Sequence, residues 1–237
     1  MSRLPMDPPV IQAQELERCF QAGSLPVMAV NGVSLDVHQG EMLVILGRSG
    51  SGKTTLLNLL GGLDRPTGGT LLWQGLDTAK LSEKEFTQWR RQNVGFVFQS
   101  FGLLPLLSAF ENVDLALRIR GVKGQERRQK ALDALKSVGL ASRASHRPYE
   151  MSGGEQQRLA IARAVAVNPT VVLADEPTGD LDSATAKDIQ QLLKGMADQM
   201  NVAMVVATHD TTFMGLAGRI KEIVDGRLKE RGVDHGT

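Results

Sequence analysis

The stretch GRSGSGKT at residues 47–54 has the residue types and spacing of a phosphate-binding loop. Its glycines let the backbone wrap closely and turn successive N–H groups inward, and a following helix adds the partial positive charge of its N-terminus. Lys53 can reach the β- and γ-phosphates, and Thr54 can bind Mg²⁺. A glycine-serine turn with a chance lysine would not explain the apolar run before it and the helical pattern after it. We expect nucleotide contacts from Gly47, Arg48, Ser49, Gly50, Ser51, Gly52, Lys53, Thr54 and Thr55.

Two carboxylates follow an apolar run in VVLADEP, residues 171–177. Asp175 is placed to bind Mg²⁺, and Glu176 can face the γ-phosphate and polarise an attacking water. Two carboxylates beside a triphosphate would repel it without a cation, so the pair implies Mg²⁺. The alternative is a strand that ends in a solvated acidic turn, but the lysine loop favours the functional interpretation.

Gln99 and His209 each end an apolar run, in FVFQ and VVATHD. Ligands bind at the carboxyl ends of strands in parallel sheets, so the position of both residues is informative. His209 could hydrogen-bond a γ-phosphate, and the amide of Gln99 could touch a metal-bound water, although either residue alone is more often structural. The catalytic candidates are Lys53, Gln99, Glu176 and His209, and the candidate Mg²⁺ ligands are Thr54, Gln99 and Asp175.

The sequence MSGGE at residues 151–155 raises the question of a second phosphate site. Ser152 and Glu155 form the capping-box pattern that begins a helix, which accounts for both of them locally. Gly153 and Gly154 have no such account, because adjacent glycines at a helix start cost stability relative to alanine. We therefore expect a ligand that needs close backbone approach at these two glycines.

Short apolar runs alternate with helical patterns and predict the element order of an α/β protein with a mainly parallel sheet. The expected buried strands are residues 42–47, 94–98, 171–175 and 202–209, and residues 184–200 are expected to be helical. The N-terminal part and residues 68–77 alternate apolar and polar side chains, which predicts antiparallel strands with one solvated face. Residues 111–138 are charged and helical in pattern, which predicts a helical subdomain.

Composition narrows the class of protein further. The formal net charge of +1 over 237 residues lacks the basic excess of a nucleic-acid binder, so we expect no nucleic-acid partner. Cys19 is the one cysteine and can form no internal disulfide, which favours a reducing compartment. No apolar run approaches the roughly 20 residues of a membrane helix, and residues 1–10 lack a signal-peptide pattern. We expect a soluble protein that reaches a membrane only through a partner.

These motifs, taken in order over about residues 11–227, resemble those of the nucleotide-binding subunits of ABC transporters. The set consists of the lysine loop, Gln99, SGGE, LADEP, GDLD at residues 179–182 and THD. The resemblance implies ATP and Mg²⁺ as ligands, and ATPase activity. It implies a single ABC domain over residues 1–237, with a P-loop NTPase core and antiparallel β subdomain at about 11–98 and 166–228. An inserted helical subdomain with the signature motif would occupy about 99–165.

The resemblance also implies a head-to-tail homodimer, in which Ser152, Gly153 and Gly154 of one copy contact the γ-phosphate held by the other. Glu176 is then the general base, His209 the γ-phosphate switch, and Asp182 a link between the two sites. Phe20 stands where the family more often has a tyrosine that stacks on adenine, and it keeps the π-face. Met151 stands where leucine is usual, a change of little volume.

Finer motifs resemble the ATPases of lipoprotein-releasing and macrolide-export systems: residues 60–71, 101–113, 152–164 and 173–183. This implies an integral membrane permease subunit with a periplasmic or extracellular domain, and a peripheral location on the cytoplasmic side of the inner (plasma) membrane. Hydrophobic residues in 99–112 either pack between sheet and helical subdomain or form a groove for that partner.

Two other functions remain open at this point. A soluble ABC-type ATPase acting on DNA or ribosomes usually carries coiled coils, zinc motifs or a second cassette, and this chain has none of them. A non-transport complex that signals or controls cell-wall enzymes would use the same ATPase cycle, because the partner determines the output.

Overall fold

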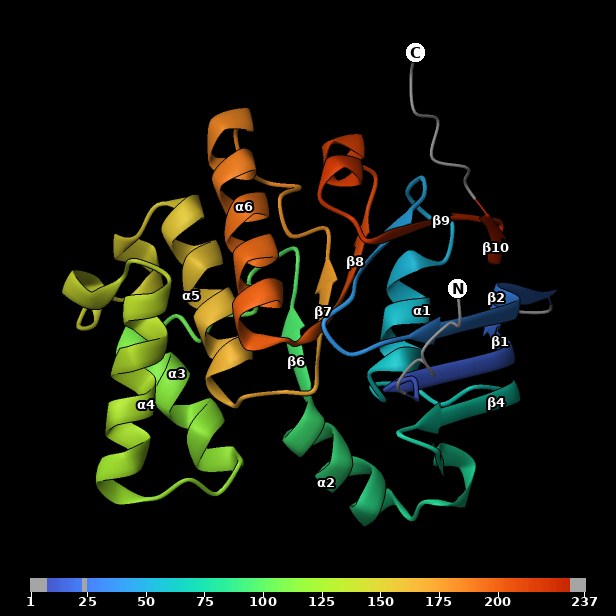
Figure 1. Ribbon diagram of the computed structural model, residues 1–237, viewed down its shortest axis with the longest axis horizontal. Coiled ribbons are helices and arrows are strands. Elements are labelled where there is room, and N and C mark those ends of the chain that lie inside the picture. The colour runs from blue at the N-terminus through green and yellow to red at the C-terminus, as the bar shows by residue number, and fades with distance from the viewer. Residues whose placement is uncertain (1–7, 23–24, 231–237) are drawn as a thin grey trace, which may run out of the picture.

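The computed structural model describes residues 8–22 and 25–230, which form a parallel sheet with helices on both faces and an antiparallel sheet beside it (Figure 1). In the larger sheet the strand order is β10-β9-β3-β8-β7-β6. All neighbours are parallel except β9 and β10. The strands are β3 (Met42–Leu46), β6 (Val94–Val97), β7 (Val171–Asp175), β8 (Ala203–Thr208), β9 (Arg219–Val224) and β10 (Arg227–Glu230).

The central strands are short and apolar because both of their faces are covered. Alternate side chains of β3 point to opposite faces, so Leu43 and Ile45 belong to one core and Val44 and Leu46 to the other. The first core lies under α1 (Lys53–Leu60) and the antiparallel sheet. The second lies under α5 (Gly153–Ala166) and α6 (Ser183–Met200). Figure 1 shows α1 and these two helices on opposite sides of the sheet.

The antiparallel sheet has the order β2-β1-β4-β5 and forms the right-hand part of Figure 1. Its strands are β1 (Ile11–Ala22), β2 (Leu25–Val37), β4 (Gly68–Trp73) and β5 (Leu76–Asp77). Irregularities of the β-bulge kind interrupt the β1–β2 register between Ala13 and Cys19. The expected antiparallel strands are therefore present, including residues 68–77.

The helical part consists of α3 (Ala109–Ile119) and α4 (Gly124–Ser137), which pack on α5 away from the sheet (Figure 1). The predicted helical stretch at residues 111–138 is thus two helices, broken around Gly121, whose φ is 92°. A further helix, α2 (Glu83–Asn93), precedes β6, and its Ser82–Glu85 capping box is a signal that the sequence reasoning did not use.

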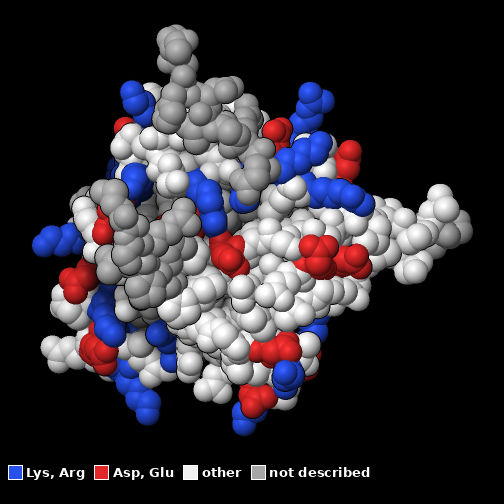
Figure 2. All heavy atoms as spheres, turned by 45° about the vertical axis from the view of Figure 1, so that its right-hand side comes forward, with Lys and Arg blue, Asp and Glu red and all other residues white. Residues whose placement is uncertain are grey.

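The strand predictions were right in position and slightly long. Gly47, Phe98, Val202 and His209 lie just outside their strands, at points where the chain turns into a loop. None of the helices in the described ranges is long and apolar enough to span a membrane. Figure 2 shows basic and acidic side chains interspersed on the face in view, in keeping with the near-zero net charge.

Candidate active site

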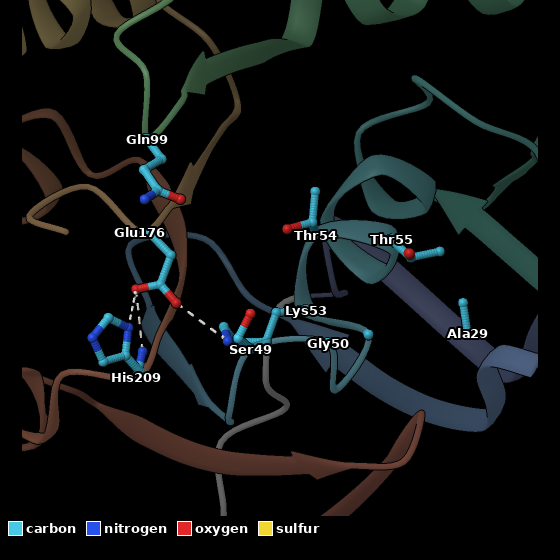
Figure 3. A pocket seen from close by; sticks show the side chains of 10 residues that line it. Ala29, Ser49, Gly50, Lys53, Thr54, Thr55, Gln99, Glu176 and His209 are labelled. Atoms are coloured by element: carbon cyan, nitrogen blue, oxygen red, sulfur yellow. Dashed lines mark hydrogen bonds and ion pairs between the residues drawn. The ribbon is translucent and has the colours of Figure 1, made fainter. Parts of the chain in front are cut away.

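A cavity of about 310 Å³ opens at the carboxyl ends of β3, β6, β7 and β8, where the sequence placed the candidate residues (Figure 3). Five residues of the phosphate-binding loop line it, together with Thr55 and the residues at three strand ends, Gln99, Glu176 and His209. The full lining is Ala29, Ser49, Gly50, Gly52, Lys53, Thr54, Thr55, Gln99, Glu176 and His209.

The loop before α1 presents its backbone to this cavity. Gly52 is the N-cap of α1 and has a φ of 104°, and a Cβ there would collide with the carbonyl oxygen of Ala29. No side chain caps the helix, so its first N–H groups are available to a ligand. Arg48 and Ser51 face a neighbouring hollow beside residues 222–225, and Gly47 lies beneath the loop against Ile223.

Lys53 is buried, and its ammonium group lies at the centre of the loop. It donates hydrogen bonds to the carbonyl oxygens of Gly47 at 2.7 Å and Arg48 at 3.0 Å. Its Nζ also lies 3.2 Å from Oε1 of Glu176. The cation therefore neutralises the glutamate across the cavity, a contact drawn in Figure 3.

Glu176 is held by four donors. Its Oε2 accepts hydrogen bonds from Thr208 Oγ1 at 2.9 Å and from the backbone N–H of His209 at 3.2 Å, and it lies 2.9 Å from His209 Nδ1. Burial alone raises the pKa of Glu176, but the hydrogen bonds from His209, Thr208 and Lys53 together bring that pKa below its ordinary value. Its backbone is left-handed at a φ of 44°, a strained conformation for a non-glycine residue.

Asp175 and Thr54 form a second pair, in which Thr54 Oγ1 donates to Asp175 Oδ2 at 2.7 Å. Burial is the main reason that the pKa of Asp175 is raised. Its Oδ1 is buried without a hydrogen-bond partner, and an orphaned carboxylate oxygen beside a hydroxyl fits a hard cation such as Mg²⁺. Gln99 lines the same cavity, with Nε2 3.5 Å from Asp180 Oδ1.

No three His, Cys, Asp or Glu side chains gather as a metal centre within residues 8–22 and 25–230. Mg²⁺ held by Asp175, Thr54 and Gln99 would thus need further oxygen ligands, which phosphates supply.

The remaining candidates lie outside the lining of this cavity. Ser152 forms the expected capping box: its Oγ accepts from Glu155 N at 3.2 Å, and its N–H donates to Glu155 Oε2 at 2.9 Å. Asp182 caps α6 by accepting from the N–H groups of Ala184 and Thr185. Phe20 is 38% exposed on β1.

The sequence offered only a ligand as the reason for the two glycines at residues 153 and 154, and packing within this chain supplies a further reason for Gly154. A Cβ on Gly154 would lie 2.5 Å from Cγ2 of Thr185, so the start of α5 packs too tightly against α6 for a side chain. Gly153 is different, because a Cβ there would meet only Leu181 Cδ2, at 3.4 Å. Close packing within one chain therefore explains Gly154 and does not explain Gly153.

Sequence reasoning did not select two residues that shape the site. Ala29 of β2 lines the cavity, but a single alanine in an alternating strand carries no sequence signal. Thr208 bonds Glu176 and also accepts from the N–H of Asp210 at 3.0 Å. The position of Thr208 next to His209, at the end of an apolar strand, was the sequence pattern that could have identified it.

Comparison with known proteins identifies relatives along almost the whole chain. A family model described as "ABC transporter" matches residues 30–179. An uncharacterized ABC transporter ATP-binding protein of Thermotoga maritima is 43% identical over 230 residues, which cover 96% of this chain and 98% of that protein. The lipoprotein-releasing system ATP-binding protein LolD of Pseudoalteromonas translucida is 44% identical over 226 residues, covering 95% and 97%.

A solved structure is similar in fold as well. It is the dimeric post-hydrolysis state of the ATP-binding cassette MJ0796 bound to ADP and Pi, from a protein of Methanocaldococcus jannaschii. The TM-score is 0.85 at 41% sequence identity, with 94% of this chain and 99% of that chain covered. With the lysine loop and Glu176 lining one cavity, and Asp175 bonded to Thr54 of that loop, this chain belongs to the ABC transporter family as one of its ATP-hydrolysing cassettes.

Proposed function

We propose that this ATPase works as a head-to-tail homodimer that closes on two ATP molecules and thereby drives a membrane subunit for export or lipoprotein extrusion. The observation that carries the proposal is the division of the expected site. The phosphate loop and Glu176 line one cavity, and Asp175 is bonded to Thr54 of that loop, while residues 152–154 lie elsewhere on the chain. A second copy supplies the missing part of the site.

Within one copy, Lys53 and the N–H groups of the phosphate loop bind the β- and γ-phosphates. Binding of those phosphates draws Lys53 away from Glu176, because the phosphates carry more negative charge than one carboxylate. Glu176 then keeps its hydrogen bonds from Thr208 and His209, which aim its carboxylate at the water that it deprotonates.

Thr54, Asp175 and Gln99 would hold Mg²⁺, and the ion would neutralise charge on the phosphates. His209 contacts the γ-phosphate with the exposed part of its ring, since the side chain lines the cavity and is 66% exposed while Nδ1 stays on Glu176. Phe20 stacks on the adenine.

Between two copies, residues 152–154 of each close over the nucleotide of the other. Ser152 is exposed, and Gly153 leaves room for a phosphate to approach the backbone at the N-terminus of α5. Asp182 begins α6 close to this turn and links the two sites. The dimeric MJ0796 cassette, bound to ADP and Pi, supports this arrangement by analogy.

The exposed hydrophobic segment after Gln99 is the proposed contact for the membrane subunit. Leu103 and Phe110 pack against the core, so they stabilise this chain itself. Leu104 and Leu106 are 44% and 80% exposed and are available to a partner. That partner is an integral membrane subunit with a periplasmic or extracellular domain, and it holds the ATPase at the cytoplasmic side of the inner membrane. The similarity to LolD supports lipoprotein release as the output.

Replacement of Glu176 by glutamine tests the ATPase cycle. The Glu176→Gln protein should bind ATP with an unchanged Kd, hydrolyse it at least a hundredfold more slowly, and accumulate as a dimer in Mg-ATP. Lys53→Ala is the matched control and should lose ATP binding and dimer formation together. Wild-type turnover by Glu176→Gln would refute the role of this carboxylate, and a strictly monomeric Glu176→Gln protein would refute the dimer.

A further inference from the structure

The capping box at the start of α5 has an additional arginine. Arg143, in the segment before α5, donates from Nε to Oε1 of Glu155 at 3.0 Å, while Oε2 of the same carboxylate accepts from Ser152 N at 2.9 Å. Glu155 therefore bridges Arg143 and the backbone of the turn at residues 152–154. The hydrogen bond from Ser152 is the main reason that the pKa of Glu155 lies below its ordinary value.

A helix of this chain does not need that arginine in order to begin. Helices α2 and α3 start with the same serine–glutamate capping box, at Ser82 and Ser108. In neither of those two boxes does the structure record an arginine bonded to the glutamate. Among these three capping boxes, the structure thus records a hydrogen bond from an arginine to the glutamate at the α5 turn alone, whereas Arg147 acts on Glu111 of α3 through its charge.

Arg143 is itself anchored to the rest of the helical subdomain. Its Nη1 lies 3.1 Å from Nε2 of His146, which accepts because a guanidinium only donates. The segment that carries both residues is pinned to the first turn of α3: Ala109 N donates to His146 O at 2.7 Å, and Phe110 N donates to Ala144 O at 2.9 Å. These two N–H groups are helix-start donors that would otherwise lack partners.

We propose that Arg143 is a positioning residue for the composite site: anchored through His146, it holds Glu155 and so keeps residues 152–154 in the conformation that closes on a second copy's nucleotide. This inference rests on the proposed dimer. Arg143 touches no nucleotide in this account, so it affects dimer closure and leaves ATP binding at Lys53 unchanged.

The test compares Arg143→Ala and Arg143→Lys with Arg127→Ala, all in the full chain. Arg127 is a matched control, because its Nε binds Asp114 Oδ1 at 2.7 Å in the same subdomain but far along the sequence from the turn. Three quantities are measured: the thermal midpoint, the Kd for Mg-ATP, and the Kd of the ATP-bound dimer in the Glu176→Gln background by sedimentation. Turnover is measured for the same variants with Glu176 intact.

Both alanine variants should lower the thermal midpoint to a similar small extent and keep the Kd for Mg-ATP within twofold. Only Arg143→Ala should weaken the dimer. The dimer contains two copies of the turn at residues 152–154, and a loss of about threefold at each raises the dimer Kd about tenfold. Turnover at limiting protein concentration should fall with it. Arg143→Lys should recover part of both losses, because it keeps a cation near Glu155 but loses the fixed bridge to His146.

Two results overturn the inference. One is an Arg143→Ala dimer with the same Kd as the Arg127→Ala dimer. The other is a loss of turnover that, in both alanine variants, simply follows the decrease in thermal midpoint. If the Glu176→Gln parent itself forms no dimer in Mg-ATP, the proposed function fails together with the inference. A dimerising parent with an unaffected Arg143→Ala variant refutes the inference alone.

Discussion

Substitutions of Gly153 and Gly154, in the signature turn at residues 152–154, should distinguish a packing role from a ligand-binding role. In Gly154→Ala the new Cβ lies 2.5 Å from Thr185 Cγ2, closer than Cβ atoms approach in real structures, so the Thr185 side chain or the two helices must shift. In Gly153→Ala the new Cβ meets Leu181 at 3.4 Å, an ordinary contact. The folded chain alone therefore tolerates one substitution and resists the other.

The magnitudes follow from packing and helix propensity. Overpacking costs about 1–3 kcal/mol, and replacing glycine by alanine in a helix returns up to about 1 kcal/mol. Gly154→Ala should thus lose about 1–2 kcal/mol, which lowers the thermal midpoint by about 2–8 °C in a chain of this length. Gly153→Ala should keep or slightly raise the midpoint. Gly195→Ala is the control for propensity alone, because its new Cβ meets no atom within 4 Å apart from its chain neighbours and its own helix backbone.

A second substitution tests the assigned contact directly. Thr185→Ser removes Cγ2 but keeps the hydroxyl that donates to Asp182 Oδ2 at 2.6 Å. The double variant Gly154→Ala/Thr185→Ser should therefore regain most of the lost thermal stability. Differential scanning calorimetry measures this recovery, and a coupled phosphate-release assay measures turnover on the same samples.

Turnover then reports on the ligand. Gly153→Ala should lose at least tenfold in turnover at an unchanged thermal midpoint and an unchanged Kd for ATP, because a methyl group blocks approach to the partner's phosphate. Wild-type turnover in Gly153→Ala would refute close backbone approach at this turn. An unchanged midpoint in Gly154→Ala, or no recovery in the double variant, would refute the packing argument.

Two further outcomes concern the carboxylates. Burial raises the pKa of Glu176, but its hydrogen bonds outweigh burial and lower that pKa in the folded protein. Ionised Glu176 therefore stabilises the fold at pH values above the unfolded-state pKa of about 4.3. This contribution to stability is lost as the pH falls through the lower folded-state pKa. His209→Ala removes one of those hydrogen bonds, so its free energy of unfolding should begin to fall at a higher pH than that of the wild type. Urea unfolding between pH 3 and 6 measures this, and superimposable pH curves for the two proteins would contradict it. Asp175→Asn should raise the Mg²⁺ concentration for half-maximal turnover at least tenfold, and an unchanged Mg²⁺ dependence would exclude Asp175 as a ligand. Because burial raises the pKa of Asp175, the wild-type Mg²⁺ requirement should rise as pH falls, whereas that of Asp175→Asn should not.

Local sequence predicted the parts of the site that depend on neighbouring residues along the chain. The strand at residues 171–175 was predicted to the residue, and the glycine loop, the capping box at Ser152 and the helix after residue 182 all formed as expected. These features follow from short-range spacing and backbone geometry. The parallel order also explains why Gln99, Glu176 and His209, far apart in sequence, reach one cavity.

Contacts between distant segments could not be predicted in the same way. The ion pair of Lys53 with Glu176, and the hydrogen bond from Thr208, depend on the registers of β3, β7 and β8 and on the depth of the cavity.

By itself, the sequence determined that this protein has a phosphate loop, two strand-end carboxylates and a signature turn, since each is a pattern of adjacent residues. Only the tertiary structure decided that Gly154 is needed to pack α5 on α6, that Leu106 is exposed while Leu103 packs inward, and that the signature turn lies outside its own chain's cavity. The physical reason is that steric overlap and burial are properties of segments brought together by folding.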